Sequence, residues 1–209
     1  MGCREVGKWG KALRRRGKII VMSAAIIFLF GSLFSACGNG GAGDSGKFNG
    51  DSSQDTANNA DCANGPLAEP IAGCTPAPVP DSGGFKADCV ARINQFRWDC
   101  QCLPPLDRWA EGETCADAQA EYDAVNGAHA GFRNEICAPR GRAQNECPGW
   151  GSETSVVADC LQLMWDEGPG DDFNAHGHYI NMSNPNYTKV ACGVYTTGSG
   201  DVWSVQNFE

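Results

Sequence analysis

Three histidines, His129, His176 and His178, are the side chains in this 209-residue sequence best suited to metal or acid–base chemistry. Glu167 lies between His129 and the His176-Gly177-His178 segment. Two neutral imidazoles and a nearby carboxylate can bind Zn²⁺ and leave one position for water, so we predict a site on these residues. Two alternatives remain open, since the imidazoles could orient one another by hydrogen bonds or stand alone in separate loops.

Three helices are predicted to position these residues. Apolar side chains recur at helical spacing over Cys89–Arg97, Leu106–Val125 and Ser152–Glu167. Ser152 is the expected N-cap of the third helix, and Gly168-Pro169 is the expected stop.

The histidines are predicted to lie outside these helices. His129 follows the second helix, and the His176–His178 segment is expected in a Gly- and Asn-rich loop, where a scaffold can expose site residues. Two later segments, Tyr187–Tyr195 and Val202–Phe208, are rich in β-branched and aromatic residues and predict an antiparallel pair. Helices followed by strands predict an α+β domain with helices packed on an antiparallel sheet.

Twelve cysteines indicate disulfides and an oxidising compartment, because cytosolic thiols stay reduced. Zinc knuckles are the alternative, but the one close pair is Cys100-x-Cys102 and no CxxC repeat occurs. Cys160 lies on the apolar face of the third helix, where we expect it to bond to Cys192 or another core cysteine.

The N-terminus has the order of an export signal. A basic segment precedes an apolar run from Ile19 to Ala36, and Cys37 follows at once, so residues 1–36 are predicted to be a lipoprotein signal peptide and Cys37 its lipidated residue. An uncleaved transmembrane anchor is the alternative, since such a run nearly spans a bilayer. Loss of Cys3 with the signal and acylation of Cys37 would leave ten cysteines, an even number that can pair completely. Gly38 rather than Asp follows Cys37, and by resemblance to bacterial lipoproteins this favours the outer membrane or cell surface.

Residues 37–84 are predicted to form a flexible Gly-, Asn- and Pro-rich tether, and residues 85–209 the folded domain. Cys62 and Cys74 interrupt the tether and either bond to each other or pin it to the domain. Beyond residue 36 the chain has nine basic and twenty-four acidic residues, a net charge near −15. We therefore expect no nucleic-acid partner, and membrane contact through the lipid anchor.

Five separated motifs resemble the CAP superfamily of cysteine-rich secretory, antigen 5 and pathogenesis-related proteins. They follow the family's order along the chain: Asn94-Gln-Phe-Arg97, Leu106 with Trp109, His129, Trp165-Asp166-Glu167, and Gly177-His178-Tyr179 followed by Val190-Ala-Cys192-Gly193. The closing segment Trp203–Phe208 resembles the family's last strand. The resemblance implies a disulfide-stabilised α-β-α sandwich with an antiparallel sheet.

The resemblance also implies a central cleft with two His and two Glu, in which some relatives bind a divalent metal between the histidines. The matching residues are His129, His178 and Glu167. The second acid belongs to a Gly-Glu-Asn segment, whose counterpart is Ala143-Gln144-Asn145, so an amide that does not titrate replaces a carboxylate. Glu146 is close by, but we expect its side chain to point to the opposite side.

Three functions remain open. The resemblance favours an exported binding module whose cleft, with Gln144 and Asn145 on its wall, holds a sterol, a fatty acid or a protein partner. The second is a metal-dependent hydrolase or protease with a water polarised between His129, His178 and Glu167, with zinc bound by the two histidines. The third is a structural surface domain without a small ligand.

Overall fold

The computed structural model describes residues 62–78 and 83–209. The predicted signal peptide, the lipidated Cys37 and most of the tether therefore lie outside the described residues. Within the described ranges, no helix has both the length and the apolar character that crossing a bilayer requires.

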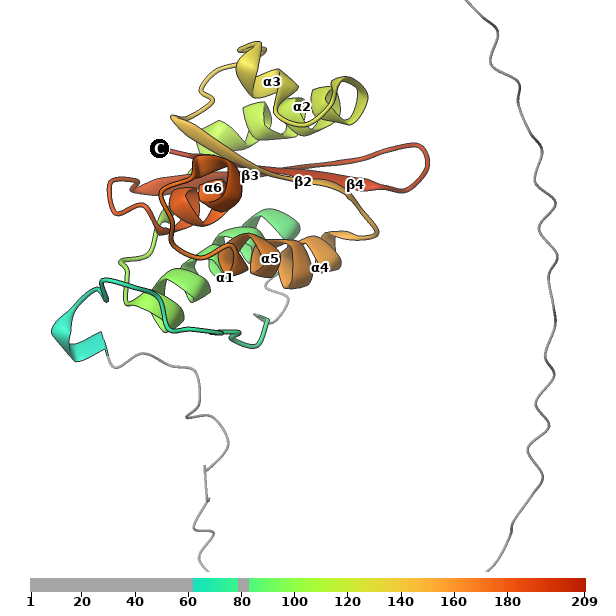
Figure 1. The fold of residues 1–209 in the computed structure, drawn as a ribbon. Helices are drawn as coiled ribbons and strands as arrows, with labels where there is room; N and C mark the ends of the chain where they lie inside the picture. The colour runs from blue at the N-terminus through green and yellow to red at the C-terminus, as the bar shows by residue number, and fades with distance from the viewer. Residues whose placement is uncertain (1–61, 79–82) are drawn as a thin grey trace, which may run out of the picture. The chain divides into compact units, whose positions relative to one another are not determined.

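A four-stranded sheet forms the middle layer, in the order β1-β3-β4-β2 (Figure 1). The predicted antiparallel pair is confirmed as β3 (Lys189–Thr196) and β4 (Val202–Phe208), and β2 (Ala143–Trp150) pairs antiparallel with the other edge of β4. The short strand β1 (Asp107–Arg108) runs parallel to β3, so the sheet is mixed rather than wholly antiparallel. The expected α-β-α sandwich is otherwise confirmed.

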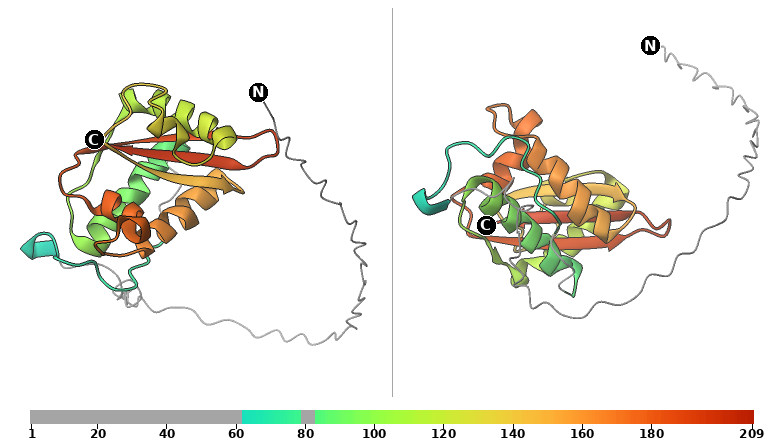
Figure 2. Two further views of the ribbon diagram at one scale, coloured as in Figure 1. Left: turned by 45° about the horizontal axis from the view of Figure 1, so that its top comes forward. Right: turned by 90° about the horizontal axis from the view of Figure 1, so that it is seen from below.

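One helical layer covers each face of the sheet (Figures 1 and 2). On one face lie α2 (Ala110–Asn126) and the short α3 (Ala130–Arg133). The approach of α2 requires Gly193 in β3, because an added Cβ there would lie 2.2 Å from the carbonyl carbon of Ala116. The second helix begins later than predicted, since Asp107 and Arg108 extend the sheet instead.

The opposite face carries α1 (Phe85–Gln101), α4 (Glu153–Ser155), α5 (Leu161–Asp166) and α6 (Phe173–Ser183). The predicted third helix is therefore interrupted, with a π-helical turn at Val156–Cys160. Ser152 caps it as expected and accepts a hydrogen bond from the main-chain N of Ser155 at 3.0 Å.

The prediction of a loop around His176 and His178 is wrong, because both histidines lie in α6. Asp172 caps this helix by accepting a hydrogen bond from the main-chain N of Asn174 at 3.0 Å. Tyr179 and Met182 bury its apolar side in the core. Packing and capping thus outweigh the low helix propensity of the Gly and Asn residues.

The Asn94-Gln-Phe-Arg97 motif connects α1 to the segments around it. The side chain of Asn94 donates to the carbonyl of Leu106 at 2.8 Å and accepts from its main-chain N at 2.7 Å. The buried Arg97 donates to the carbonyl oxygens of Met182 at 2.7 Å and Asn184 at 3.2 Å. The motif therefore fixes the C-terminal end of α6, the helix that carries His178.

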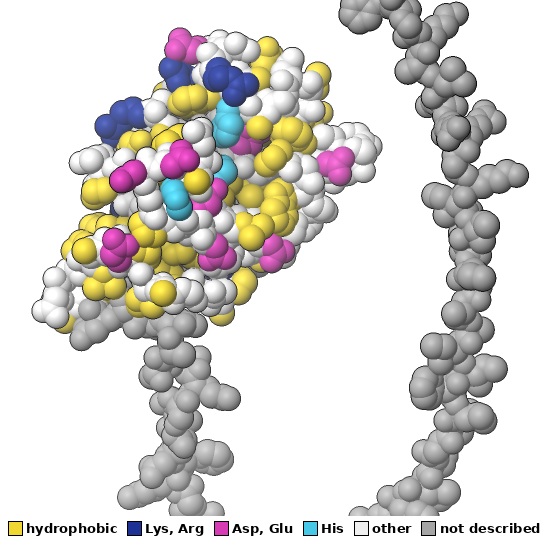
Figure 3. Space-filling model, viewed as in Figure 1, with side chains coloured by type: hydrophobic (Ala, Val, Ile, Leu, Met, Phe, Trp, Pro, Cys, Tyr) yellow, Lys and Arg dark blue, Asp and Glu magenta, His cyan; other side chains and the backbone are white. Residues whose placement is uncertain are grey.

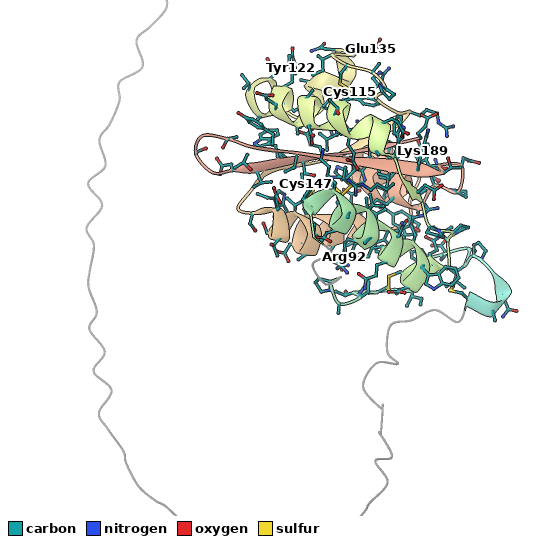
Figure 4. All side chains as sticks on the ribbon, turned by 180° about the vertical axis from the view of Figure 1, so that it is seen from behind. Arg92, Cys115, Tyr122, Glu135, Cys147 and Lys189 are labelled. Carbon is teal, nitrogen blue, oxygen red and sulfur yellow. A yellow bond between two sulfur atoms is a disulfide. The ribbon has the colours of Figure 1, made fainter. Side chains whose placement is uncertain are left out.

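All ten cysteines of the described residues form disulfides. The bonds are Cys62–Cys102, Cys74–Cys100, Cys89–Cys192, Cys115–Cys137 and Cys147–Cys160. The partner of Cys160 is thus Cys147, and Cys62 and Cys74 pin the tether to the end of α1 rather than bond to each other. Figure 4 shows Cys115 in the α2 layer and Arg92 in the α1 layer, on opposite sides of the sheet.

Candidate functional site

A cleft of about 420 Å³ brings together residues that lie far apart in the sequence. Its lining includes all five predicted site residues: His129, Gln144, Asn145, Glu167 and His178. They come from the start of α3, from β2, from the end of α5 and from α6. Figure 3 shows histidine side chains on one face of the molecule, with basic and acidic side chains near them.

Glu167 holds His178 through both its ring and its main chain. The Nδ1 atom of His178 lies 2.5 Å from Oε1 of Glu167, and the main-chain N of His178 donates to Oε2 at 2.9 Å. Because an ionised carboxylate only accepts hydrogen bonds, Nδ1 carries the proton. The Nε2 atom of a neutral His178 therefore keeps its lone pair for a ligand.

Gln144 orients His129 in a similar way, but without charge. Its Nε2 donates to Gln119 at 3.0 Å and to Asn207 at 3.4 Å, which turns its carbonyl oxygen toward His129. This oxygen lies 2.7 Å from Nδ1 of His129, so Nδ1 again carries the proton and Nε2 stays available. An amide thus preserves the hydrogen bond that a carboxylate would make.

Asn145 joins the strand β2 to helix α6. It is fully buried, and its Nδ2 donates to the carbonyl oxygen of His178 at 3.0 Å. Its Oδ1 accepts from Nδ2 of Asn181 at 2.8 Å. The role of Asn145 is therefore to position the main chain of His178, since both atoms of its amide are already engaged.

The expectation that Glu146 points to the opposite side is wrong. Its Oε2 accepts a hydrogen bond from the main-chain N of His129 at 2.6 Å and lies 3.7 Å from the Nδ1 of the ring. Side chains alternate with a period of two along a strand, so residues 144 and 146 share a face. This spacing was the sequence signal for Glu146 as a site residue.

Asp123, near the end of α2, is the second buried acid that sequence reasoning missed. Its Oδ1 accepts from the main-chain N of Gly131 at 2.6 Å, and its carboxyl group interacts with that of Glu146. Burial raises the pKa of Asp123, and burial together with the charge of Asp123 raises the pKa of Glu146 to about 7.

His176 does not line the cleft. Its Nδ1 lies 2.7 Å from the carbonyl oxygen of Glu167 and 3.0 Å from that of Gly168. Two residues apart on a helix, His176 and His178 point in different directions. The helix therefore directs the ring of His176 away from the cleft that His178 lines.

The cleft offers fewer metal ligands than the sequence suggested. Glu167 orients His178 instead of standing apart as a third ligand, and Gln144 is an amide. In the part of the chain that the structure describes, no three His, Cys, Asp or Glu side chains are grouped so as to hold a metal ion. A catalytic zinc usually takes three protein ligands, and this set supplies two imidazoles.

The fold and cleft define a disulfide-stabilised α-β-α sandwich with two oriented histidines. The profile of the Cysteine-rich secretory protein family (CAP) matches residues 90–208, so the chain belongs to the CAP family.

Two solved structures are similar over part of their length. "Structure of BmVAL-1" has 17% identity and a TM-score of 0.46, with 63% of this chain and 81% of that chain covered. "Crystal Structure of Na-ASP-1" has 15% identity and a TM-score of 0.45, with 69% and 43% covered. No curated protein matches the chain.

Proposed function

We propose that this CAP domain is an exported binding module whose cleft holds a small amphipathic molecule with an apolar body and an anionic end. The observation that carries the proposal is the lining of the cleft, which combines two aromatic side chains with two arginines. A fatty acid is the simplest molecule of this kind. A volume of about 420 Å³ lies within the usual range for small-molecule sites.

The apolar part of the lining comes from Phe132 and Phe173. Phe173 is 59% exposed at the first residue of α6, and its side chain lines the cleft. Contact with an apolar ligand would remove this ring from water and stabilise the complex by about 25 cal/mol for each Å² buried.

The charged part of the lining favours an anion. Arg133 lies in the cleft without a carboxylate within 4.0 Å among the described residues, and Arg142 reaches Glu209 only at 3.7 Å. Glu167, the one acid in the lining, is committed to His178. An acidic protein with a cationic cleft is suited to select a carboxylate or another anion through the guanidinium groups.

The five disulfides of the domain suggest a secreted or extracellular protein. We propose further that Cys37 anchors it to the cell envelope, at the outer membrane or the cell surface. The apolar segment before Cys37 and the even number of cysteines after it support this part of the proposal.

The full chain in lipid nanodiscs, titrated calorimetrically with octanoate and with octanol, tests the charge selection. We expect saturable binding that is about tenfold tighter for octanoate, because a charge-assisted hydrogen bond replaces a neutral one. Arg133→Gln should reduce this preference, with Arg142 still in the lining. Arg108→Gln is the matched control, since Arg108 pairs with Glu113 at 2.5 Å and does not line the cleft. Equal binding of both probes, or none, would contradict the proposal.

A second candidate function is weak binding of zinc by the two histidines, alone or as part of a hydrolase. The Nδ1 atoms of His129 and His178 are held by Gln144 and Glu167, which leaves both Nε2 atoms as potential ligands. Two imidazoles leave most of the coordination sphere to water, so we expect modest affinity. The third candidate, a structural surface domain, predicts that neither octanoate nor zinc binds.

A further inference from the structure

We propose that Asp123 and Glu146 act as one positioning unit, a buried carboxyl pair that holds the main chain at His129 in the conformation the cleft requires. The inference deepens the proposed function, because His129 is one wall of that cleft. Its geometrical basis does not depend on which ligand the cleft holds.

The backbone of His129 needs such support. Its φ is +61°, in the left-handed region, which few residues other than Gly adopt, although Asn, Asp and His adopt it more often than the rest. The residue stands between the end of α2 and the four-residue helix α3, and its neighbours Gly127 and Ala128 are exposed. A residue holds such a conformation only when surrounding contacts fix it.

The two acids supply these contacts from two neighbouring layers, the sheet and the helical layer that contains α2. Glu146 reaches from β2 to the main-chain N of His129, and Asp123 reaches from α2 to the main-chain N of Gly131, each at 2.6 Å. Alternate main-chain N–H groups of one turn are thus bound by two side chains. Both acids are almost completely buried, with exposed fractions of 0% for Asp123 and 3% for Glu146.

The other oxygen atoms of the pair explain why two acids can be buried together. Oδ2 of Asp123 and Oε1 of Glu146 are buried and have no hydrogen-bond donor among the described residues, and the two carboxyl groups interact with each other. A carboxyl group bonds to a carboxylate only through a proton, so one proton shared by the pair would satisfy both atoms. The two carboxyl groups thus form one unit, between β2 and α2, that accepts the hydrogen bonds from the main chain at His129 and Gly131.

The pair also fixes the ring of His129. Once the main chain is held, the direction of the Cα–Cβ bond is set, and Nδ1 meets Gln144 at 2.7 Å. Gln144 and Glu146 share one face of β2 and therefore act on the ring and the main chain of one residue. Glu146 is thus a positioning residue and does not itself line the cleft.

Residue-resolved hydrogen exchange on the full chain tests the unit. In the wild type, the amides of His129 and Gly131 should exchange much more slowly than that of the exposed Ala128. Glu146→Leu should raise the exchange rate of the His129 amide at least about tenfold, because it removes the carboxyl group that this amide donates to. The Gly131 amide, which donates to Asp123, should also exchange faster if the two acids act as one unit. Glu146→Gln should keep both amides protected, since its amide can accept from His129 and donate to Asp123.

Glu113→Leu is the matched control. Glu113 is also a buried acid of α2, but it pairs with Arg108 at 2.5 Å and lies outside the cleft. It should alter stability without changing exchange at His129. Unprotected amides in the wild type would overturn the inference even if Glu146→Leu fails to fold. So would equal exchange in the Leu and Gln variants.

Octanoate titration separates this inference from the proposed function. We expect Glu146→Leu to weaken octanoate binding about tenfold, with wild-type affinity in Glu146→Gln and Glu113→Leu. If the wild type binds no octanoate but the exchange pattern holds, the proposed function fails and the positioning unit stands. If octanoate binds and the pattern is absent, the inference fails alone.

Discussion

The carboxylate of Glu167 contacts His178 twice, with Oε1 2.5 Å from the ring Nδ1 and Oε2 2.9 Å from the main-chain N. One side chain at the end of α5 therefore sets the tautomer of the imidazole and binds the main chain of α6 at His178. The contact is partly exposed, with 34% of the His178 side chain and 25% of the Glu167 side chain accessible. We therefore expect this contact to orient the imidazole of His178 more than it stabilises the folded chain.

We predict that Glu167→Ala lowers zinc affinity about tenfold or more, the usual effect of removing a carboxylate behind a ligating histidine. The unfolding free energy should fall by only about 1 kcal/mol, since solvent screens the pair. Calorimetric titration and urea unfolding give the two quantities. Asp166→Ala is a suitable control, because Asp166 is the exposed neighbour. Equal zinc affinity in both variants would show that Glu167 does not orient His178.

Zinc itself should bind with modest affinity through His129 and His178. Either His→Ala substitution should abolish calorimetric binding, whereas His176→Ala should retain it, because His176 faces the carbonyl oxygens of Glu167 and Gly168. Binding should weaken below about pH 6, when protons compete for imidazole nitrogen. Loss of zinc in His176→Ala but not in His129→Ala would refute this arrangement.

The buried Glu146 predicts a pH-dependent stability. Burial raises its pKa to about 7 in the folded chain, above the usual value of 4.5 that we assign to the unfolded chain. The folded state therefore holds the proton more tightly, and its stability should fall as the pH rises from about 4.5 to about 7, by at most about 1.4 kcal/mol per unit. Glu146→Gln removes the titrating group. The unfolding free energy of the wild type should therefore fall relative to that of Glu146→Gln as the pH rises across this range. Parallel curves would contradict the prediction.

The disulfides should differ in their contribution to stability. Cys89–Cys192 closes 103 residues, whereas Cys147–Cys160 closes 13. In the chain-entropy account, replacing the first pair by Ser should cost about 4 to 5 kcal/mol and the second about 3 kcal/mol. Urea unfolding of the two double variants tests the order.

Alkylation of the native protein without reduction should label none of the ten described cysteines.

Lipidation at Cys37 is a separate prediction. Cys37→Ser should abolish labelling by a fatty-acid probe and remove the chain from the membrane fraction. A mutant that stays membrane-bound with its N-terminus intact would indicate the transmembrane anchor instead. Ser35→Ala, two residues before the cysteine, keeps a small side chain and should label normally.

The sequence predicted those parts of the fold that repeat a local pattern. Helical spacing located α1 and α2, and β-branched residues located β3 and β4, because one face of each element is buried. It failed at α6, whose Gly and Asn residues have low helix propensity, and whose helical form depends on the Asp172 cap and on packing through Tyr179 and Met182.

The site was predicted less completely. The resemblance supplied His129, Gln144, Glu167 and His178, and the structure brings them into one cleft. Asp123 escaped notice, since only the tertiary fold places the end of α2 beside β2. Local sequence carries no information on that approach, nor on which of the ten cysteines are partners.

The two bonds from Cys62 and Cys74 to the end of α1 set a mechanical limit. A chain held in a membrane at Cys37 has only the 25 residues up to Cys62 to extend, a leash of at most about 85 Å. Any pull along this leash enters the domain through covalent bonds at Cys102 and Cys100. The load therefore enters the domain at the C-terminal end of α1, the helix that Cys89–Cys192 joins to β3.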